Sequence, residues 1–426
     1  MTSDVAAVDG ESQAVVDAAR GWFESNWDPD LSLGDWWVLL AESGWGFPTW
    51  PTHRYGRGID PRLAPMVSLA RRAVGALGPP AGIGPNLAGP TLLAHGSEDQ
   101  QDRFLPGIVH GEIWCQLFSE PGSGSDLASL QTRAVRDGDQ WVVNGQKVWT
   151  SGAHIARYGI LVARTNPDVP KHQGLTYFVI DMDQPGIEIR PIREMTGRSI
   201  FNEVFLADAV VPEASRLDEV GSGWGVALTT LANERTMLGA GSFGSSGGGM
   251  SITKPDLSGR VGDMVRDTAS GEGAPSGGVG SLLQALVRRY DRADDPLIRQ
   301  EYATIYSLLE RSPGSPICGS KERSNVVERT GGLGRQVGRQ PSPAHLARDD
   351  VPSLWRRRDA VGPGRPLGGR MHDIGFSSYL ISIGGGTDQI QRNIIGERYS
   401  GLEGTQRRQG VAFSELLVGT QRTNDE

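Results

Sequence analysis

The chain is poor in cysteine and in long apolar runs, and each absence excludes a class of protein. Its 426 residues include two cysteines, Cys115 and Cys318. Two thiols so far apart in sequence supply neither a disulfide framework nor a cysteine-based zinc site, which fits a reducing compartment. No run approaches the roughly 20 apolar residues that span a bilayer, and the acidic N-terminus does not resemble a secretion signal. We therefore expect a cytoplasmic protein with no membrane span and no metal site.

A surplus of basic residues is also missing. The chain has 42 Lys and Arg against 50 Asp and Glu, a formal net charge of -8. This balance argues against an affinity of the whole protein for nucleic acid. The length exceeds the size at which a single core stops growing, so we expect two or three domains, with enough core to bury a cofactor.

The first part of the chain has the pattern of helices. Apolar residues recur at helical spacing over residues 31–43 and 61–77, and Pro and Gly clusters separate these stretches. Ser97 and Gln100 match a capping box, which predicts a helix through Leu105. We therefore predict an α-helical N-terminal domain over residues 1–110.

The period changes after Gly111. Apolar residues flank Asn144-Gly145, a pair that favours a tight turn, so we predict a hairpin of strands 140–143 and 146–149. Further predicted strands lie at 160–163, 175–180, 187–189 and 204–206. Together they indicate a small β-barrel middle domain over residues 111–220.

Helical spacing returns in a third domain, predicted over residues 221–403, with a tail at 404–426. Its expected helices are 224–237, 282–289 and 297–310. The Gly- and Ser-rich stretch 239–280 is predicted to be a flexible linker. Residues 312–366 are crowded with Gly, Pro and Arg and show no apolar helical face, so we expect an irregular segment there. A genuine loop and two compensating reading-frame shifts both explain this segment.

Two segments of the middle region have the composition of a ligand site. Residues 117–126 read LFSEPGSGSD, and residues 146–152 read QKVWTSG. A strand that ends in a Pro/Gly turn exposes backbone N–H groups and hydroxyls, which suits a pyrophosphate. Trp149 could lie against a flat conjugated ring, with Ser119, Thr150 and Ser151 at its polar edge. The alternatives are an ordinary turn and a core tryptophan.

These two segments, with GTDQIQRNIIGER at residues 386–398, resemble the signatures of the acyl-CoA dehydrogenase family. The resemblance implies an α-helical N-terminal domain, a β-barrel middle domain and an α-helical bundle at the C-terminus. It also implies an FAD-dependent oxidoreductase of lipid metabolism that desaturates an acyl-CoA thioester, as in fatty acid β-oxidation. The expected electron acceptor is an electron-transferring flavoprotein, and the expected assembly is a homo- or hetero-oligomer.

The resemblance also indicates a catalytic base. Many family members carry a Glu directly before the last motif, where this chain has Gly385. A subset places the base on an earlier helix as Glu followed by Arg, and Glu234 and Arg235 occupy that place here. We expect Glu234 to be the base and Arg235 to bind the CoA end of the substrate. The alternative is an ordinary solvent-facing Glu-Arg pair, and Ala232 replaces an Asp that is common two positions before the base.

Cofactor contacts are carried over from the same motifs. The resemblance implies that Ser125 contacts a phosphate or the substrate and that Arg289 reaches the cofactor of a neighbouring subunit. The positions that match flavin-ring and closing-helix contacts are Gln116, Phe118, Ser119, Trp149, Ser151, Thr387 and Gln389.

Two other functions stay open at this point. The irregular residues 312–366 would suit a non-catalytic subunit that completes a partner's site in a hetero-oligomer. The Arg run at 356–358 would suit a nucleic-acid-associated member of the superfamily, although such runs are more often solvated. The motifs do not distinguish fatty, branched and steroid acyl groups.

Overall fold

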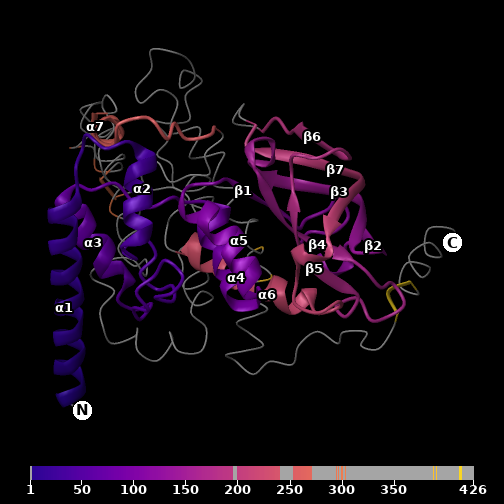
Figure 1. Cartoon of the computed structure of the whole chain (residues 1–426), viewed down its shortest axis with the longest axis horizontal. Coiled ribbons are helices and arrows are strands. Elements are labelled where there is room, and N and C mark those ends of the chain that lie inside the picture. The colour runs from indigo at the N-terminus through magenta and orange to yellow at the C-terminus, as the bar shows by residue number, and fades with distance from the viewer. Residues whose placement is uncertain are drawn as a thin grey trace. The chain divides into compact units, whose positions relative to one another are not determined.

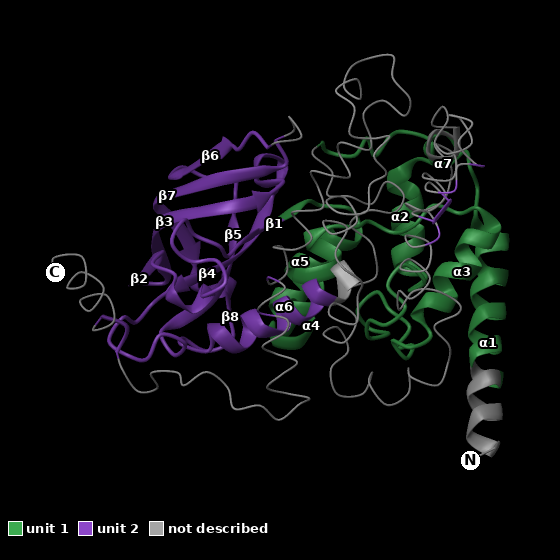
Figure 2. Cartoon of the chain, turned by 180° about the vertical axis from the view of Figure 1, so that it is seen from behind, with its two compact units in different colours: residues 1–114, 253–271 green, residues 115–252, 272–426 purple. Residues whose placement is uncertain are grey.

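The computed structural model describes residues 2–194, 199–239 and 253–270, with isolated positions at 294, 296, 299, 300, 303, 387, 390 and 412–414. The expected helix 282–289, the segment 312–366, and most of 297–310, of 386–398 and of the tail lie outside the described residues. The chain divides into two compact units, residues 1–114 with 253–271, and residues 115–252 with 272–426 (Figure 2).

The first unit is helical, as predicted, and the capping box at its last long helix is confirmed. The Ser97 side chain accepts a hydrogen bond from the Gln100 N–H at 3.3 Å, and the Gln100 side chain accepts one from the Ser97 N–H at 3.0 Å. The helices are α1 Thr2–Asn26, α2 Leu33–Glu42, α3 Ala64–Val74, a π-helical turn Gly84–Ala88, α4 Gly89–His95 and α5 Glu98–Val109 (Figure 1).

The core of this unit is rich in tryptophan. Phe23 from α1, Trp36 from α2 and Val67 from α3 are buried together. A buried indole N–H needs an acceptor, and both tryptophans of α2 find one in the chain after α3. Trp36 donates to the Leu77 carbonyl at 3.1 Å, and Trp37 donates to the Gly78 carbonyl at 3.0 Å.

The prediction of a flexible linker over 239–280 is wrong for residues 253–270. This stretch contains the helix α7, Val261–Ser270, and joins the helical unit. The Leu257 and Gly259 carbonyls accept hydrogen bonds, each 2.9 Å long, from the Gly34 and Leu33 N–H groups of the first turn of α2. Those N–H groups have no partner within their own helix. The segment therefore completes the N-terminus of α2.

Val261 anchors the same segment by burial. Its side chain is fully buried in the tryptophan-rich core, and Met264, one helical turn later, packs against that core. Two apolar residues are too few to reveal a helical pattern in a stretch dominated by Gly and Ser. The composition of 239–280 therefore predicted a linker.

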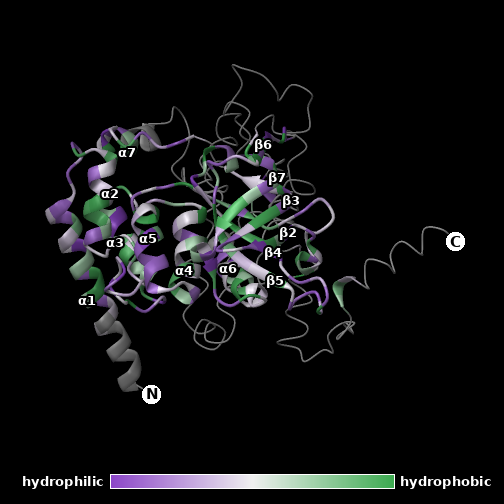
Figure 3. Cartoon of the chain, turned by 45° about the vertical axis from the view of Figure 1, so that its right-hand side comes forward, coloured by the Kyte–Doolittle hydropathy of each residue, from purple (hydrophilic) through white to green (hydrophobic). Residues whose placement is uncertain are grey.

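The second unit is built on one eight-stranded sheet. The strands follow the order β6-β7-β3-β2-β4-β5-β8, with β1 paired to β4. Strand β2 pairs with β4 in parallel, whereas β2 with β3, β3 with β7, β4 with β5, β5 with β8 and β6 with β7 are antiparallel. The hydrophobic residues run along the strands (Figure 3), and Trp141, Leu161, Phe178 and Val204 lie in the buried core. The strands are β1 Trp114–Leu117, β2 Arg133–Asp137, β3 Gln140–Ser151, β4 Tyr158–Arg164, β5 Leu175–Asp181, β6 Ile187–Pro191, β7 Phe201–Pro212 and β8 Arg216–Leu217.

The hairpin predicted at Asn144-Gly145 is wrong. Strand β3 runs unbroken through this pair, and its register with β7 shifts between Val143 and Gly145. The extra residue lies in β7, where Ala207 and Asp208 face Asn144, so the bulge is on the partner strand. Glycine is needed at position 145 because a Cβ there would lie 2.3 Å from the hydroxyl oxygen of Thr132. The turn lies one strand earlier, between β2 and β3, where Gly138 has a φ of 62°. The helix predicted at 224–237 is confirmed as α6, Gly223–Gly239.

Among the described residues, no helix is both long enough and apolar enough to cross a membrane.

We expect Val261→Ala to lower the free energy of unfolding of the helical unit by about 1–2 kcal/mol, because two buried methyl groups are lost. Leu257→Ala is the matched control. Its side chain is 45% exposed, and its carbonyl bond to α2 survives the substitution. Urea unfolding followed by tryptophan fluorescence measures both variants. Equal stabilities of the two variants would show that 253–270 contributes no core packing.

Candidate functional site

The two segments singled out from the sequence lie side by side in the sheet unit. The Val148 N–H of β3 donates to the Ser119 carbonyl at 2.9 Å. Glu120 and Ser123 then close a tight turn with a pair of backbone hydrogen bonds of 2.9 and 3.0 Å. The exposed Pro/Gly residues of the first segment are thereby fixed next to the strand that carries Trp149.

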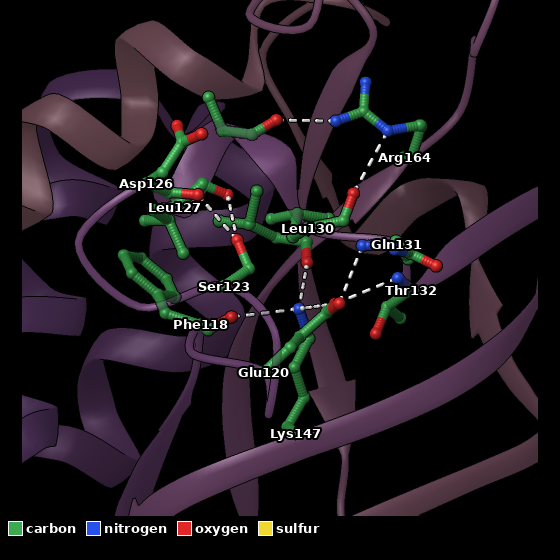
Figure 4. A network of polar contacts seen from close by, with 12 residues as sticks. Phe118, Glu120, Ser123, Asp126, Leu127, Leu130, Gln131, Thr132, Lys147 and Arg164 are labelled. Carbon is green, nitrogen blue, oxygen red and sulfur yellow. Dashed lines mark hydrogen bonds and ion pairs between the residues drawn. The ribbon is translucent and has the colours of Figure 1, made fainter. Parts of the chain in front are cut away.

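A buried ion pair joins the same two segments (Figure 4). Lys147 Nζ lies 2.9 Å from Glu120 Oε1, and their side chains are 0% and 8% exposed. The ammonium also donates to the Phe118 carbonyl at 3.1 Å and to the Val162 carbonyl at 2.9 Å. Three acceptors satisfy all three N–H groups of the ammonium. This is the condition under which a buried cation is tolerated.

The carboxylate of Glu120 is satisfied equally well. Its two oxygens accept the backbone N–H groups of Gln131 at 2.6 Å and Thr132 at 2.9 Å. Burial opposes its ionisation, but the Lys147 ammonium and these hydrogen bonds outweigh burial and hold the pKa of Glu120 below its ordinary value. Burial lowers the pKa of Lys147, while its three acceptors stabilise the ammonium. We conclude that both groups are charged.

Arg164, at the end of β4, holds the chain that follows the turn. Its guanidinium donates to the carbonyls of Ala128 at 2.6 Å and Leu130 at 3.1 Å, so it fixes the segment that leads to β2. It also donates to the Lys171 carbonyl at 3.1 Å, and Phe413 stacks on it at 3.5 Å. Two buried cations and one buried carboxylate therefore hold residues 118–132 in place.

Trp149 is presented outward from β3. Its side chain is 59% exposed, its φ is 60°, and it lies where the register of β3 and β7 shifts between Lys147 and Thr150. A positive φ is uncommon for a bulky residue and tends to occur at functional sites. The alternative of a core tryptophan is therefore excluded. Thr150, expected to share this face, is buried instead, while Ser151 is half-buried.

Helix α6 brings Glu234 to the start of the first segment. Val226 and Thr230 are fully buried, and Glu234 follows at the same four-residue spacing, so all three share one face of the helix. The Thr230 hydroxyl lies 2.9 Å from the Tyr177 hydroxyl of β5. Glu234 Oε2 accepts a hydrogen bond from Gln116 Nε2 of β1 at 3.1 Å. The face of Glu234 is thus turned toward the sheet, which weighs against the solvent-facing alternative.

The remaining predicted site residues have diverse surroundings. The Phe118 side chain is buried and edge-on to Tyr177 at 5.9 Å. Ser119 is half-buried, Ser125 is exposed on the turn, and Arg235 is half-buried. Thr387 accepts a hydrogen bond from the Ile390 N–H at 3.3 Å, which is the bond of a helix N-cap. Arg289 and Gln389 lie outside the described residues.

Sequence reasoning missed three residues that hold this site together: Glu120, Lys147 and Arg164. A usable signal was present for the first two. Glu120 directly follows a predicted buried strand, and Lys147 is the only charged residue of the second segment. Charges in such places are rarely buried without a partner.

Comparisons with known proteins agree with a helical N-terminal domain followed by a sheet domain. A family model of the N-terminal domain of acyl-CoA dehydrogenases matches residues 10–112, and a model of their middle domain matches residues 115–209. Acyl-CoA dehydrogenase IpdE1 of Mycobacterium tuberculosis is 36% identical over 385 residues, which cover 86% of this chain and 87% of that protein.

Two further similarities are informative. Acyl-CoA dehydrogenase FadE34 of the same organism is 52% identical over 205 residues, 48% of this chain, but the match spans only 29% of that protein. A chain of the ChsE4-ChsE5 complex from Mycobacterium tuberculosis has a similar fold, with a TM-score of 0.56 at 24% identity over 93% of this chain and 98% of that one.

We expect either single substitution, Lys147→Met or Glu120→Gln, to lower the free energy of unfolding by about 3–5 kcal/mol, because each leaves one buried polar partner uncompensated. The double variant should lose much less than the sum of the two. The exposed pair Arg190 and Glu188 serves as the control, since solvent screens it and its loss should change little. Urea unfolding of all variants gives the coupling. Additive losses at Lys147 and Glu120 would contradict the pairing.

Proposed function

The chain belongs to the acyl-CoA dehydrogenase family, whose members are flavoprotein oxidoreductases acting on acyl-CoA, and from this premise we propose that it desaturates an acyl-CoA thioester between its α and β carbons. The observation that carries the proposal is the position of Glu234. A carboxylate, held by an amide of β1, lies at the start of the segment that resembles the flavin-binding motif.

In this proposal Glu234 removes the α proton of the acyl chain. Such a proton is only weakly acidic, so a positioned carboxylate and a polarised thioester carbonyl are both needed. The structure supports Glu234 as the base because it lies on the same face of α6 as the buried residues Val226 and Thr230, and this face is turned toward the sheet. Arg235 follows it in the chain and would bind the CoA end of the substrate. Gly385 offers no carboxylate at the other position that the family uses.

The residues around Trp149 fit a flavin such as FAD. An exposed indole on an irregular strand offers a flat apolar face, and Ser119 and Ser151 are half-buried on the two neighbouring segments. These residues, with the backbone of Phe118, would hold the ring, and Ser125 on the exposed turn would contact a phosphate. Thr387, Gln389 and Arg289 would complete the site. When bound, the flavin would accept the hydride from the β carbon.

We predict that Glu234→Gln lowers turnover by about two to four orders of magnitude, the usual contribution of a positioned general base. The substitution preserves volume, so bound flavin should keep its visible spectrum. Glu203→Gln is the matched control, because Glu203 also accepts a hydrogen bond from a glutamine, Gln146, at 3.3 Å. Dye reduction with acyl-CoA substrates measures both. Wild-type activity of Glu234→Gln would rule out this base.

We predict that Trp149→Ala releases flavin or changes its absorption while the sheet stays folded, because the indole is exposed and contributes little to the core. Trp141→Ala provides the contrast, since Trp141 is buried in the sheet core and its loss should destabilise the unit. Flavin titration and thermal unfolding separate the two effects. If Trp149→Ala unfolds the sheet with no specific effect on flavin, Trp149 is structural.

A second candidate function is that of a subunit in a hetero-oligomer, with the chemistry in the partner. It is favoured by the similar fold of a chain in the ChsE4-ChsE5 complex. Sedimentation of the purified chain, with flavin counted per chain, tests it. A chain that binds flavin and is bleached by acyl-CoA on its own would exclude a purely supporting role. We further propose that electrons leave to an electron-transferring flavoprotein.

A further inference from the structure

We propose that Gln116 is a positioning residue for Glu234, whose side-chain amide orients the carboxylate and can bond it in both of its protonation states. This inference deepens the proposed function and depends on Glu234 being the base. It assigns Gln116 a role different from the direct flavin contact that the motif implies.

Strand β1 determines where Gln116 points. Cys115 and Leu117 are fully buried in the core of the sheet unit, and successive side chains of a strand point to opposite faces. Gln116 therefore lies on the face turned away from that core, where it is half-buried. Its amide meets a carboxylate that is 118 positions away in the sequence.

Helix α6 is fixed independently on the same sheet. The hydroxyl pair of Tyr177 and Thr230 attaches the helix to β5 one turn before Glu234. At the N-terminus of the helix, a Cβ added to Gly223 would lie 2.6 Å from the backbone of Thr176, so the helix approaches β5 as closely as its backbone allows. Strand β4 pairs with both β1 and β5. The distance between the backbone of Gln116 and that of Glu234 is thus fixed by the sheet.

The chemistry of a base suits an amide partner. An ionised carboxylate only accepts hydrogen bonds, whereas a protonated one also donates, and a glutamine amide has both a donor and an acceptor. Gln116 can donate its N–H to the carboxylate before proton transfer. After the C–H bond breaks and the proton has moved to Glu234, a half-turn of the amide lets its carbonyl accept the new O–H. A cation in this place would instead favour the ionised form throughout.

Gln116→Met tests this role, because methionine keeps the length and volume of glutamine but cannot form the hydrogen bond. Gln146→Met is the matched control, since Gln146 also donates to a glutamate, Glu203, from a half-buried position. We expect Gln116→Met to slow substrate reduction of the bound flavin by roughly 10- to 100-fold, the range expected when a hydrogen bond to a charged group is lost. Flavin affinity and substrate KM should stay close to the wild type.

Two measurements distinguish positioning from a structural effect. Loss of an N–H donor disfavours the ionised carboxylate and so raises the pKa of Glu234. The acid limb of the pH–rate profile should therefore move to higher pH in Gln116→Met and stay in place in Gln146→Met. Infrared spectra of the flavin-free protein should show a shifted carboxylate band in Gln116→Met. The band is assigned by its loss in Glu234→Gln.

The results separate failure of this inference from failure of the proposed function. If Glu234→Gln abolishes activity but Gln116→Met leaves the rate, the acid limb and the carboxylate band unchanged, Gln116 has no positioning role. Weaker flavin binding with an unmoved acid limb would make Gln116 a flavin contact instead. Full activity of Glu234→Gln would reject the base itself. In the Glu234→Gln background, Gln116→Met should cause no further loss of rate.

Discussion

The geometry of the sheet unit depends on one buried charge. Lys147 places an ammonium where its side chain has no solvent exposure, and an unpaired ammonium in such a place costs several kcal/mol. Only a conformation that brings Glu120 and two carbonyls to Nζ avoids that cost. The tight turn, the chain up to Thr132 and the strand that carries Trp149 are all connected to these partners. The Lys147 ammonium would destabilise the core without its partners, and its need for those partners fixes the position of the turn and of the strand that carries Trp149.

Local signals in the sequence predicted much of this fold. The capping box at Ser97 satisfies free N–H groups within four residues, so it is readable without tertiary structure. The same holds for the runs of apolar residues that became β4 and β5 and for the helical spacing of α6. At Asn144-Gly145 a local signal gave the wrong answer, because Gly145 permits a close approach of Thr132 and not a turn, and β3 stays paired with β7 on both sides of it.

What the sequence could not predict depends on partners far apart in the chain. Glu234 was chosen from a motif, but its contact with Gln116 joins a strand and a helix that share no local pattern. The docking of 253–270 on α2 could not be predicted either, because its hydrogen bonds are made by backbone carbonyls, which leave no pattern in the sequence. The resemblance to a family pointed to the outward face of Trp149. Its positive φ is a property of the register of β3 with β7 and becomes visible only in the structure.

The return of residues 253–270 to the helical unit has a consequence for synthesis of the chain. The unit begins at the N-terminus, but Val261, which fills part of its core, leaves the ribosome only after the whole sheet has been made. At translation rates of about 5–20 residues per second, the 138 residues between Trp114 and Thr253 take roughly 7–28 seconds. During that interval the first turn of α2 exposes its N–H groups, and the tryptophan-rich core lacks one of its members. All strands of the sheet are therefore synthesised before the helical unit is complete, although that unit begins first. The order of the domains along the chain thus does not determine which of them can finish folding first.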